Sequence, residues 1–297
     1  MTRRVFLRLL QAGVATGVFG GGWALAEPFW LRVQRYAFTP RDWPKGLRLR
    51  LAILTDFHTC TPWMDGARVA TIADAAQALD ADAILLLGDY VKGPRPSRPI
   101  PEQDWAAPLG RLKAPLGVHA VLGNHDWWQD PPAATVRGRL PRAGLALQEA
   151  GVRVYHNEAV RLEKDGHAFW LAGLGDQLAQ LQIVGDEVPF GFDDLDGVLA
   201  QIKTDEPVIL MAHEPDIFPD VPERISLTLC GHTHAGQVRL FGYPPVMSTR
   251  VARRYDWGHF NEGARHLVVS AGLGCSHLPI RFGAPPEIVM LDLGVAA

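Results

Sequence analysis

Short apolar runs alternate with amphipathic segments along most of the chain. Leu49–Thr55 and Ala83–Leu87 are apolar runs of strand length, and Gly66–Leu79 between them carries apolar residues at helical spacing. This order predicts a β-α-β unit with a parallel strand pair. Downstream we expect the strands Leu116–Leu122, Val208–Met211, Ser226–Leu229, Val238–Leu240, His266–Ser270 and Ile288–Leu293, a hairpin over Val160–Leu174, and helices over Leu140–Ala150 and Asp193–Ile202. The pattern predicts a mixed α/β fold with enough strands for two sheets.

The first 26 residues follow a different pattern. Arg3-Arg4 precede Phe6-Leu7 and an almost wholly apolar or small stretch, residues 9–26, which ends in Ala24-Leu25-Ala26. This is typical of a twin-arginine signal, so we expect residues 1–26 to be a signal peptide or N-terminal anchor. Export by the twin-arginine translocation machinery would place the protein in the periplasm or another extracytoplasmic space, at the inner-membrane surface if the segment is retained. A Sec signal or an uncleaved anchor is the alternative, because about 18 residues approach the ~30 Å hydrocarbon thickness of a bilayer.

A lead-in segment, residues 27–48, precedes the main body. Pro28–Arg50 interleaves aromatic and basic side chains. This mixture suits the headgroup region of a membrane, and its alternation equally suits an opening β-ribbon that covers a sheet edge. We expect one catalytic domain, residues 49–297, because no linker-like stretch divides the remainder.

Composition excludes several classes of protein. Of the 297 residues, 47% are hydrophobic and 21% are charged, so the chain is neither disordered nor collagen-like. The formal net charge is −3, which argues against a nucleic acid as partner. Cys60, Cys230 and Cys275 form no C-x-x-C pair, so we expect each to be a buried free thiol.

Polar residues that can do chemistry follow five of the expected strands. The five clusters are Asp56-Phe57-His58, Gly88-Asp89, Gly123-Asn124-His125-Asp126, His213-Glu214 and Gly231-His232-Thr233-His234. Open α/β sheets place their sites at such strand exits. Gly88, Gly123 and Gly231 each precede a candidate ligand, where the absence of a Cβ permits a sharp turn and a close approach to the site.

These residue types indicate a two-metal centre. Imidazole nitrogens with carboxylate oxygens suit Mn, Fe or Zn. The seven candidate ligands are Asp56, His58, Asp89, Asn124, His213, His232 and His234. Seven are too many for one tetrahedral ion, whereas two ions that share a bridging carboxylate use all of them and keep positions open for water and substrate. Two divalent ions and two carboxylates leave a surplus of positive charge, so a phosphoryl group is the expected occupant.

The ordered motifs resemble those of the calcineurin-like metallophosphoesterase superfamily, from about residue 49 to the C-terminus. The resemblance implies a four-layer αββα sandwich of two mixed β-sheets with flanking helices and a dinuclear centre at the sheet ends. It implies that Asp89 bridges two ions, with His125 contacting the phosphate or protonating the leaving group and Asp126 orienting His125. The resemblance assigns Asp56, His58, Asp89 and His234 to the first ion, and Asp89, Asn124, His213 and His232 to the second.

Within the superfamily, the leader, the segment Gly231–Gln237 and the tail Gly272–Glu287 resemble the bacterial phosphodiesterase subgroup named for YkuE and YaeI. This implies a phosphodiesterase or pyrophosphatase that uses metal-activated hydroxide. Some relatives cleave a UDP-diacylglucosamine, so the resemblance also allows a lipid-linked substrate. The alternatives are an exported metal-binding or lipid-carrier module without turnover, a phosphomonoesterase, and a protein phosphatase or exonuclease of the same superfamily. The export signal argues against a protein phosphatase and against an exonuclease, because the usual substrates of both are cytoplasmic.

Three further positions admit two interpretations each. Arg281 is a candidate substrate-binding residue, beside Asn124, because a guanidinium grips phosphate oxygens in a fork, but it also fits a packing role. His277 fits either a site role or a turn. Trp127-Trp128 either line a substrate groove or belong to the core.

Overall fold

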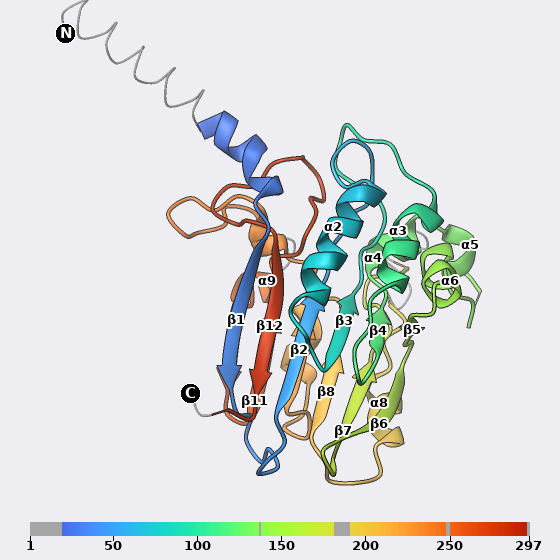
Figure 1. Ribbon diagram of the computed structural model, residues 1–297, viewed down its shortest axis with the longest axis vertical. Helices are drawn as coiled ribbons and strands as arrows, with labels where there is room; N and C mark the ends of the chain where they lie inside the picture. Colours follow the sequence, from blue (N-terminus) through green and yellow to red (C-terminus); the bar gives the residue numbers. More distant parts are fainter. Residues whose placement is uncertain (1–19, 137, 181–190, 248–249, 296–297) are drawn as a thin grey trace, which may run out of the picture.

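Two six-stranded mixed sheets lie face to face in the structure, a computed structural model that describes residues 20–136, 138–180, 191–247 and 250–295 (Figure 1). The first sheet has the order β1 Arg32–Phe38, β12 Glu287–Leu293, β2 Leu49–Leu54, β3 Ala83–Leu87, β4 Val118–Val121 and β5 Arg153–Val154. The second has the order β10 Gly258–Glu262, β11 Arg265–Val269, β9 Leu227–Cys230, β8 Val208–Met211, β7 His167–Gly173 and β6 Glu158–Lys164.

Helices cover the outer face of each sheet. The first sheet packs against α2 Gly66–Gln77, α3 Glu102–Gly110 and α6 Arg142–Glu149, and the second against α8 Leu195–Gln201, α9 Arg250–Arg254 and the 3-10 helix η2 Pro215–Asp220. The remaining short helices are α4 Asn124–Trp128, α5 Pro131–Ala134, η1 Glu27–Phe29 and η3 His234–Gly236. The predicted four-layer αββα sandwich is therefore confirmed.

The alternation of side chains along each strand builds these layers. In β2, Leu51 and Ile53 enter the core between the sheets, whereas Ala52 and Leu54 point into the core under the helices. Successive strand residues face opposite sides of a sheet, and both sides are covered here. The strands β3 and β8, at the middle of the two sheets, are accordingly apolar at every position and not merely on every second one.

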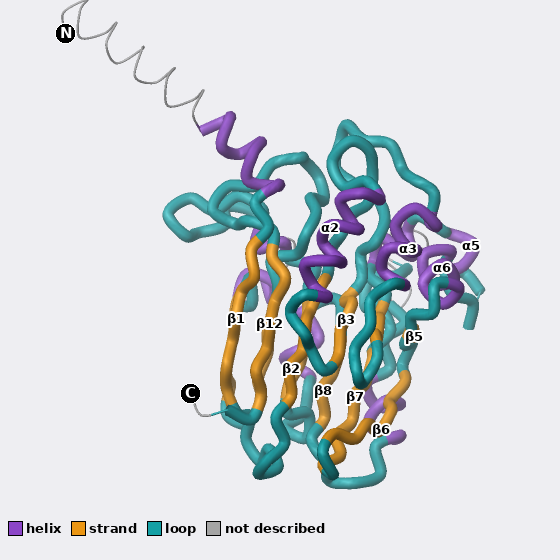
Figure 2. The backbone as a smooth tube through the Cα atoms, viewed as in Figure 1, coloured by secondary structure: helices purple, strands orange, loops and turns teal. Residues whose placement is uncertain are grey.

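The central strands of each sheet run in parallel. In the first sheet β2, β3, β4 and β5 are parallel to one another, and in the second β7, β8, β9 and β11 are. Long loops gather at the upper end of the strands (Figure 2). The carboxyl ends of parallel strands are where open sheets place their sites, so this topology brings the polar strand exits together.

The structure corrects one predicted strand and adds elements that the sequence did not predict, helix α3 among them. Val238–Leu240 is not a strand but carries two isolated bridges, Val238 to Phe282 and Leu240 to Tyr243. Gly236 and Gly242 on either side have φ angles of 76° and 80°, which turn the chain out of an extended ladder. Helix α3 was not expected, since its nine residues include Pro108 and show no long apolar period.

The N-terminal part of the described chain is attached to the first sheet. Residues 20–26 are helical, and β1 pairs in parallel with β12 along the edge of that sheet. The predicted twin-arginine motif, Arg3-Arg4, lies outside the described residues. Among the residues that are described, no helix combines the length and apolarity needed to cross a bilayer.

Candidate metal centre

All seven candidate ligands come together where the carboxyl ends of the two sheets meet. They arrive from the exits of β2, β3 and β4 in the first sheet and of β8 and β9 in the second. Three overlapping groups have ligand atoms within 4.8 Å of one another: Asp56, His58 and His234; His58, Asp89 and His125; and Asp89, His213 and His232. Each group could hold a metal ion.

The first group joins the exit of β2 to the segment after β9. The Nε2 atoms of His58 and His234 lie 2.9 Å apart, and His234 Nε2 lies 3.4 Å from Asp56 Oδ1. Asp56 also accepts the backbone N–H of His232 at 3.1 Å, which ties the two segments together. Two imidazoles and a carboxylate therefore face a common point.

Asp89 connects this group to the second one. Its Oδ2 atom lies 3.5 Å from His58 Nε2 and 3.3 Å from His213 Nε2. On the far side, His232 Nδ1 lies 3.1 Å from Asn124 Oδ1. One carboxylate thus stands between two sets of nitrogen and oxygen donors, which is the position that the sequence predicts for a bridging residue.

Hydrogen bonds outside the groups orient two of the rings. His58 Nδ1 faces the carbonyl oxygen of Lys92 at 2.8 Å, and His213 Nδ1 faces that of Leu87 at 2.7 Å. A ring nitrogen that faces a carbonyl carries the hydrogen, so each ring directs its other nitrogen, Nε2, toward the site.

The donor set fits divalent cations. His232 Nε2 is buried without a hydrogen-bond partner, which is costly for a polar atom unless a ligand satisfies it. Imidazole nitrogen with carboxylate and amide oxygen suits Mn, Fe or Zn. The residues that the structure brings together are therefore of the right kind to hold such ions.

Burial governs the protonation of these groups. Desolvation lowers the pKa of His232 to about 3 and also lowers the pKa of His58 and His234, so these rings are neutral, the form that binds metals. Although burial opposes both shifts, the mutual attraction of Asp89 and His213 holds the pKa of Asp89 well below its usual range and that of His213 well above it. Asp89 is accordingly an anion in the middle of the site.

The backbone at these strand exits is unusual. Asp56, His58, Asp89, His232 and His234 have φ angles of 55°, 50°, 56°, 67° and 51°. Side chains other than glycine seldom adopt positive φ, and such conformations persist where surrounding contacts impose them, often at functional sites. Five of the seven candidate ligands are therefore held in left-handed turns.

The glycines of the motifs allow close packing at the centre. Gly88 has φ 96°, and a Cβ there would lie 2.8 Å from His213 Nδ1. A Cβ on Gly123 would lie 2.8 Å from His213 Cε1. The predicted requirement for a residue without a side chain before the ligands is confirmed at these two positions.

Comparison with known proteins gives the family of this chain. The family model for calcineurin-like phosphoesterases matches residues 49–236. The chain belongs to the calcineurin-like phosphoesterase family. It is 31% identical to phosphodiesterase YaeI of Escherichia coli (strain K12) over 305 residues, 99% of each chain. It is 29% identical to the uncharacterized metallophosphoesterase YkuE of Bacillus subtilis (strain 168) over 303 residues, 99% of this chain and 98% of YkuE. The solved structure of the calcineurin-like phosphoesterase YfkN from Bacillus subtilis aligns with a TM-score of 0.45 at 14% identity, covering 77% of this chain and 82% of YfkN.

In this phosphoesterase, Asp126 contacts the ligand loops and not the ring of His125. Its carboxylate accepts the backbone N–H groups of Asp89 at 3.0 Å, Gly123 at 2.9 Å and Tyr90 at 2.9 Å. The expected role of orienting His125 is thus replaced by that of joining the exits of β3 and β4.

His125 itself lies beside the metal groups. Its ring contacts that of Trp128 edge to face at a centroid distance of 5.0 Å, and its Nδ1 atom is buried without a hydrogen-bond partner. Its backbone N–H donates to Asp89 Oδ1 at 2.9 Å. Trp128 therefore borders the site, whereas Trp127 is buried in the core under the helices.

Arg281 is fully buried, and its side chain is occupied. The guanidinium donates to the carbonyl oxygens of Gly274, Ala284 and Ala271, and its Nη2 atom lies 3.4 Å from His234 Nδ1. These contacts favour a role in positioning His234 over the phosphate contact expected from sequence. The three cysteines are free and buried, as predicted.

Two further buried carboxyls lie near the site: Glu214, which the sequence motifs include only as the neighbour of His213, and Asp176, which they do not include. Asp176 and Glu214 are both about 1% exposed, and desolvation, reinforced by the charge of Glu214, raises the pKa of Asp176 well above its usual range. Asp176 follows β7 in the sequence Leu174-Gly175-Asp176, just as Asp89 follows β3 in Leu87-Gly88-Asp89. The same Gly-Asp pattern at a strand exit could have identified it.

Proposed function

We propose that this phosphoesterase is a phosphodiesterase or pyrophosphatase that depends on two divalent ions. The observation that carries the proposal is the position of Asp89, within reach of His58 on one side and of His213 on the other. A carboxylate in that place can serve two cations at once, which is the arrangement of two-metal hydrolases.

The ligands divide between the two ions as the motifs imply. Asp89 is common to both. Asp56, His58 and His234 would complete the first ion, and Asn124, His213 and His232 the second. When bound, the ions supply positive charge for the phosphoryl oxygens and a hydroxide nucleophile near neutral pH.

The chain itself positions the substrate and handles charge. Asn124 can donate its amide N–H₂ to a phosphoryl oxygen while its Oδ1 faces the second ion. Desolvation keeps the pKa of His125 at about 3, so its ring is neutral and donates one N–H, either to a phosphoryl oxygen or to the leaving oxygen. Asp126 keeps the loops that carry Asp89 and Asn124 in register through the N–H groups of Asp89 and Gly123.

We propose a phosphodiester, lipid-linked in its natural form, as the substrate class, and twin-arginine export as the route to its compartment. The relative YaeI is named a phosphodiesterase. The lipid link is supported by a group of exposed apolar side chains near the N-terminal segment: Trp23, Phe29 and Trp30 on that segment, and Phe241 and Tyr243 on a loop after η3.

Hydrogen bonds link the two exposed segments. Arg281 N–H donates to the carbonyl of Ala24, and Phe282 N–H donates to that of Gln237, a few residues before the loop. Figure 1 shows the loop and the helix of residues 20–26 at the same end of the molecule. Exposed aromatic side chains on segments at one end of the molecule suit the membrane interface.

Hydrolysis of bis-p-nitrophenyl phosphate beside p-nitrophenyl phosphate, with and without Mn²⁺, tests the activity. We expect Mn²⁺-dependent turnover that favours the diester. Bound metal without turnover on either ester would support a binding module instead, and faster hydrolysis of the monoester would support a phosphomonoesterase. A panel with UDP-diacylglucosamine beside soluble nucleotides tests the lipid link, and activity on the nucleotides alone would contradict it.

A further inference from the structure

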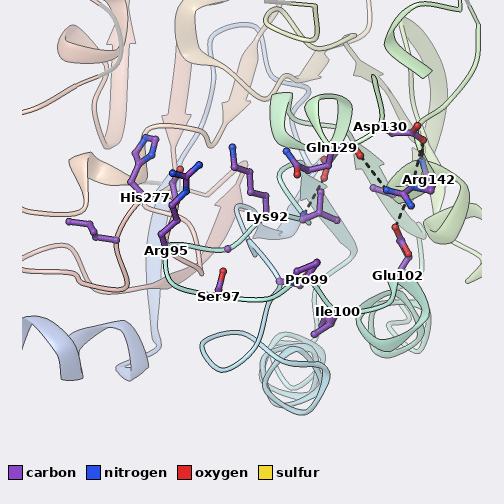
Figure 3. Close-up of a pocket in the computed structure, with 17 residues that line it drawn as sticks. Lys92, Arg95, Ser97, Pro99, Ile100, Glu102, Gln129, Asp130, Arg142 and His277 are labelled. Atoms are coloured by element: carbon purple, nitrogen blue, oxygen red, sulfur yellow. Dashed lines mark hydrogen bonds and ion pairs between the residues drawn. The ribbon is translucent and has the colours of Figure 1, made fainter. Parts of the chain in front are cut away.

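A cavity of about 690 Å³ opens beside Lys92 and Arg95 (Figure 3). Its wall includes the segment after β3, the beginning of α6 and the segment around His277. Asp126, which joins the ligand loops, also lines it, and the carbonyl of Lys92 in its wall contacts His58 Nδ1 at 2.8 Å. A phosphoester whose phosphoryl group lies between the metal groups therefore has this cavity beside it for the rest of the molecule.

One end of the cavity carries uncompensated positive charge. Figure 3 shows the side chains of Lys92, Arg95 and His277 side by side, with their nitrogen atoms directed the same way. The backbone N–H of Arg95 donates to the carbonyl of His277 at 3.0 Å, which holds the two segments together. Within the described ranges, no carboxylate lies at ion-pair distance from Lys92 or Arg95.

The other end of the cavity is neutralised by the chain's own groups. Arg142 Nε lies 3.6 Å from Glu102 Oε1 and 3.9 Å from Asp130 Oδ2. A cation that is already paired with carboxylates attracts an anionic ligand only weakly. Lys92 and Arg95 have no such pairing, so they attract an anionic ligand more strongly than Arg142 does.

We propose that Lys92 and Arg95 are specificity-determining residues: they bind a second anionic group of the substrate and so distinguish a diester of a diphosphate from a diester of a single phosphate. The proposal rests on the proposed function, since the metal centre takes the first phosphoryl group. Lysine offers a point charge and arginine a planar fork for the oxygens of the second. Pro99, Ile100 and Leu278 in the same wall provide apolar contact for the organic part.

Two compounds that differ by a single phosphoryl unit test this assignment. Diphenyl phosphate and P1,P2-diphenyl diphosphate share the same phenyl groups, and calorimetric titration of the full chain, metal-free and Mn²⁺-loaded, gives a Kd for each. The variants are Lys92→Gln and Arg95→Gln. Arg98→Gln is the matched control, because Arg98 is exposed on the same segment but does not line the cavity.

We expect the wild-type chain to bind the diphosphate about tenfold more tightly than the monophosphate, and Lys92→Gln and Arg95→Gln each to reduce that ratio about three- to fivefold, as partly exposed charge contacts do. Arg98→Gln should keep the ratio, and raising the salt concentration should lower it in the wild type. Equal Kd values for the two compounds in the wild type, or an equal loss in Arg98→Gln, would overturn the assignment. A preserved preference for the diphosphate without hydrolysis of any phosphoester would instead reject the proposed function.

Discussion

Asp89 Oδ2 lies 3.3 Å from His213 Nε2, although the two residues follow strands of different sheets. β3 and β8 belong to separate layers, and their carboxyl ends meet only because the sheets pack face to face. The candidate metal centre is therefore a property of the interface between the layers and not of either sheet alone.

Asp89→Asn should disturb both metal sites at once. The amide keeps one oxygen but loses the negative charge that both proposed ions share. We expect the metal content of the purified chain to fall from about two ions to less than one, with activity falling in parallel. Asp74→Asn, an exposed carboxylate on α2, is the control. One fully occupied site with normal activity in Asp89→Asn would refute the bridge.

His125→Ala should lower turnover and leave the metals in place. The ring is proposed to act on the phosphate rather than on a metal, and a single proton-transfer or charge-stabilising group is worth about 10²–10⁴ in kcat. Metal analysis and steady-state kinetics on the same preparation check this. Because His125 also forms a group with His58 and Asp89, a joint loss of metal and activity would make it a ligand instead.

Asp126→Asn should destabilise the fold as well as the site. The carboxylate accepts the N–H groups of Asp89 and Gly123 on one oxygen and that of Tyr90 on the other, and an amide has only one acceptor oxygen. Leaving buried N–H groups unpaired costs about 1–3 kcal/mol each, so the free energy of unfolding should fall by about 2 kcal/mol or more. Urea unfolding of metal-free protein measures it, with exposed Asp104→Asn as control. Unchanged stability in Asp126→Asn would show that these contacts contribute little.

Phe241 should enter the lipid interface. All three native cysteines are buried, so a polarity-sensitive dye can be attached to Phe241→Cys alone, with exposed Leu145→Cys on α6 as the matched control. On addition of phosphatidylethanolamine and phosphatidylglycerol vesicles, we expect the emission of the dye to shift to the blue at position 241 and not at 145. No shift at either position, or the same shift at both, would remove the support for a membrane-facing loop.

The buried carboxyl of Asp176 should make the metal-free protein less stable as pH rises. Desolvation and the neighbouring Glu214 raise its pKa well above 3.8, so the folded state binds more protons than the unfolded state above pH 4. The contribution of Asp176 to the free energy of unfolding is therefore complete below pH 4. It is lost as pH rises toward the pKa that Asp176 has in the folded state. Asp176→Asn removes the contribution of this group to the dependence, because an amide does not titrate, and it keeps an acceptor for the N–H of Leu178.

Thermal unfolding in the presence of a chelator measures the effect. The Tm of Asp176→Asn minus that of the wild type should increase between pH 4 and pH 7. The same difference for exposed Asp205→Asn should stay flat. A constant difference for Asp176→Asn would mean that the carboxyl titrates normally.

The order of strands, helices and ligand motifs was readable from the sequence because each depends on neighbouring residues. The apolar run Leu49–Leu54 and the helical period of Gly66–Gln77 are local patterns, and Asp56, Asp89 and Asn124 follow the ends of such apolar runs. A local pattern of this kind can predict a strand wrongly where the apolar run has only a few residues. The three residues Val238–Leu240 matched a strand, but two nearby glycines turn the chain away.

The contacts of each side chain were decided only by the tertiary structure. Sequence could not show that Asp126 binds the loop of Asp89 instead of the ring of His125, or that Arg281 is enclosed by carbonyl oxygens. Nor could it show that Arg142 is neutralised while Arg95 is not. Burial, hydrogen-bond geometry and charge balance depend on which distant segments share a small volume. A periodic pattern specifies the face that a residue occupies, and the packing of the layers decides what lies opposite it.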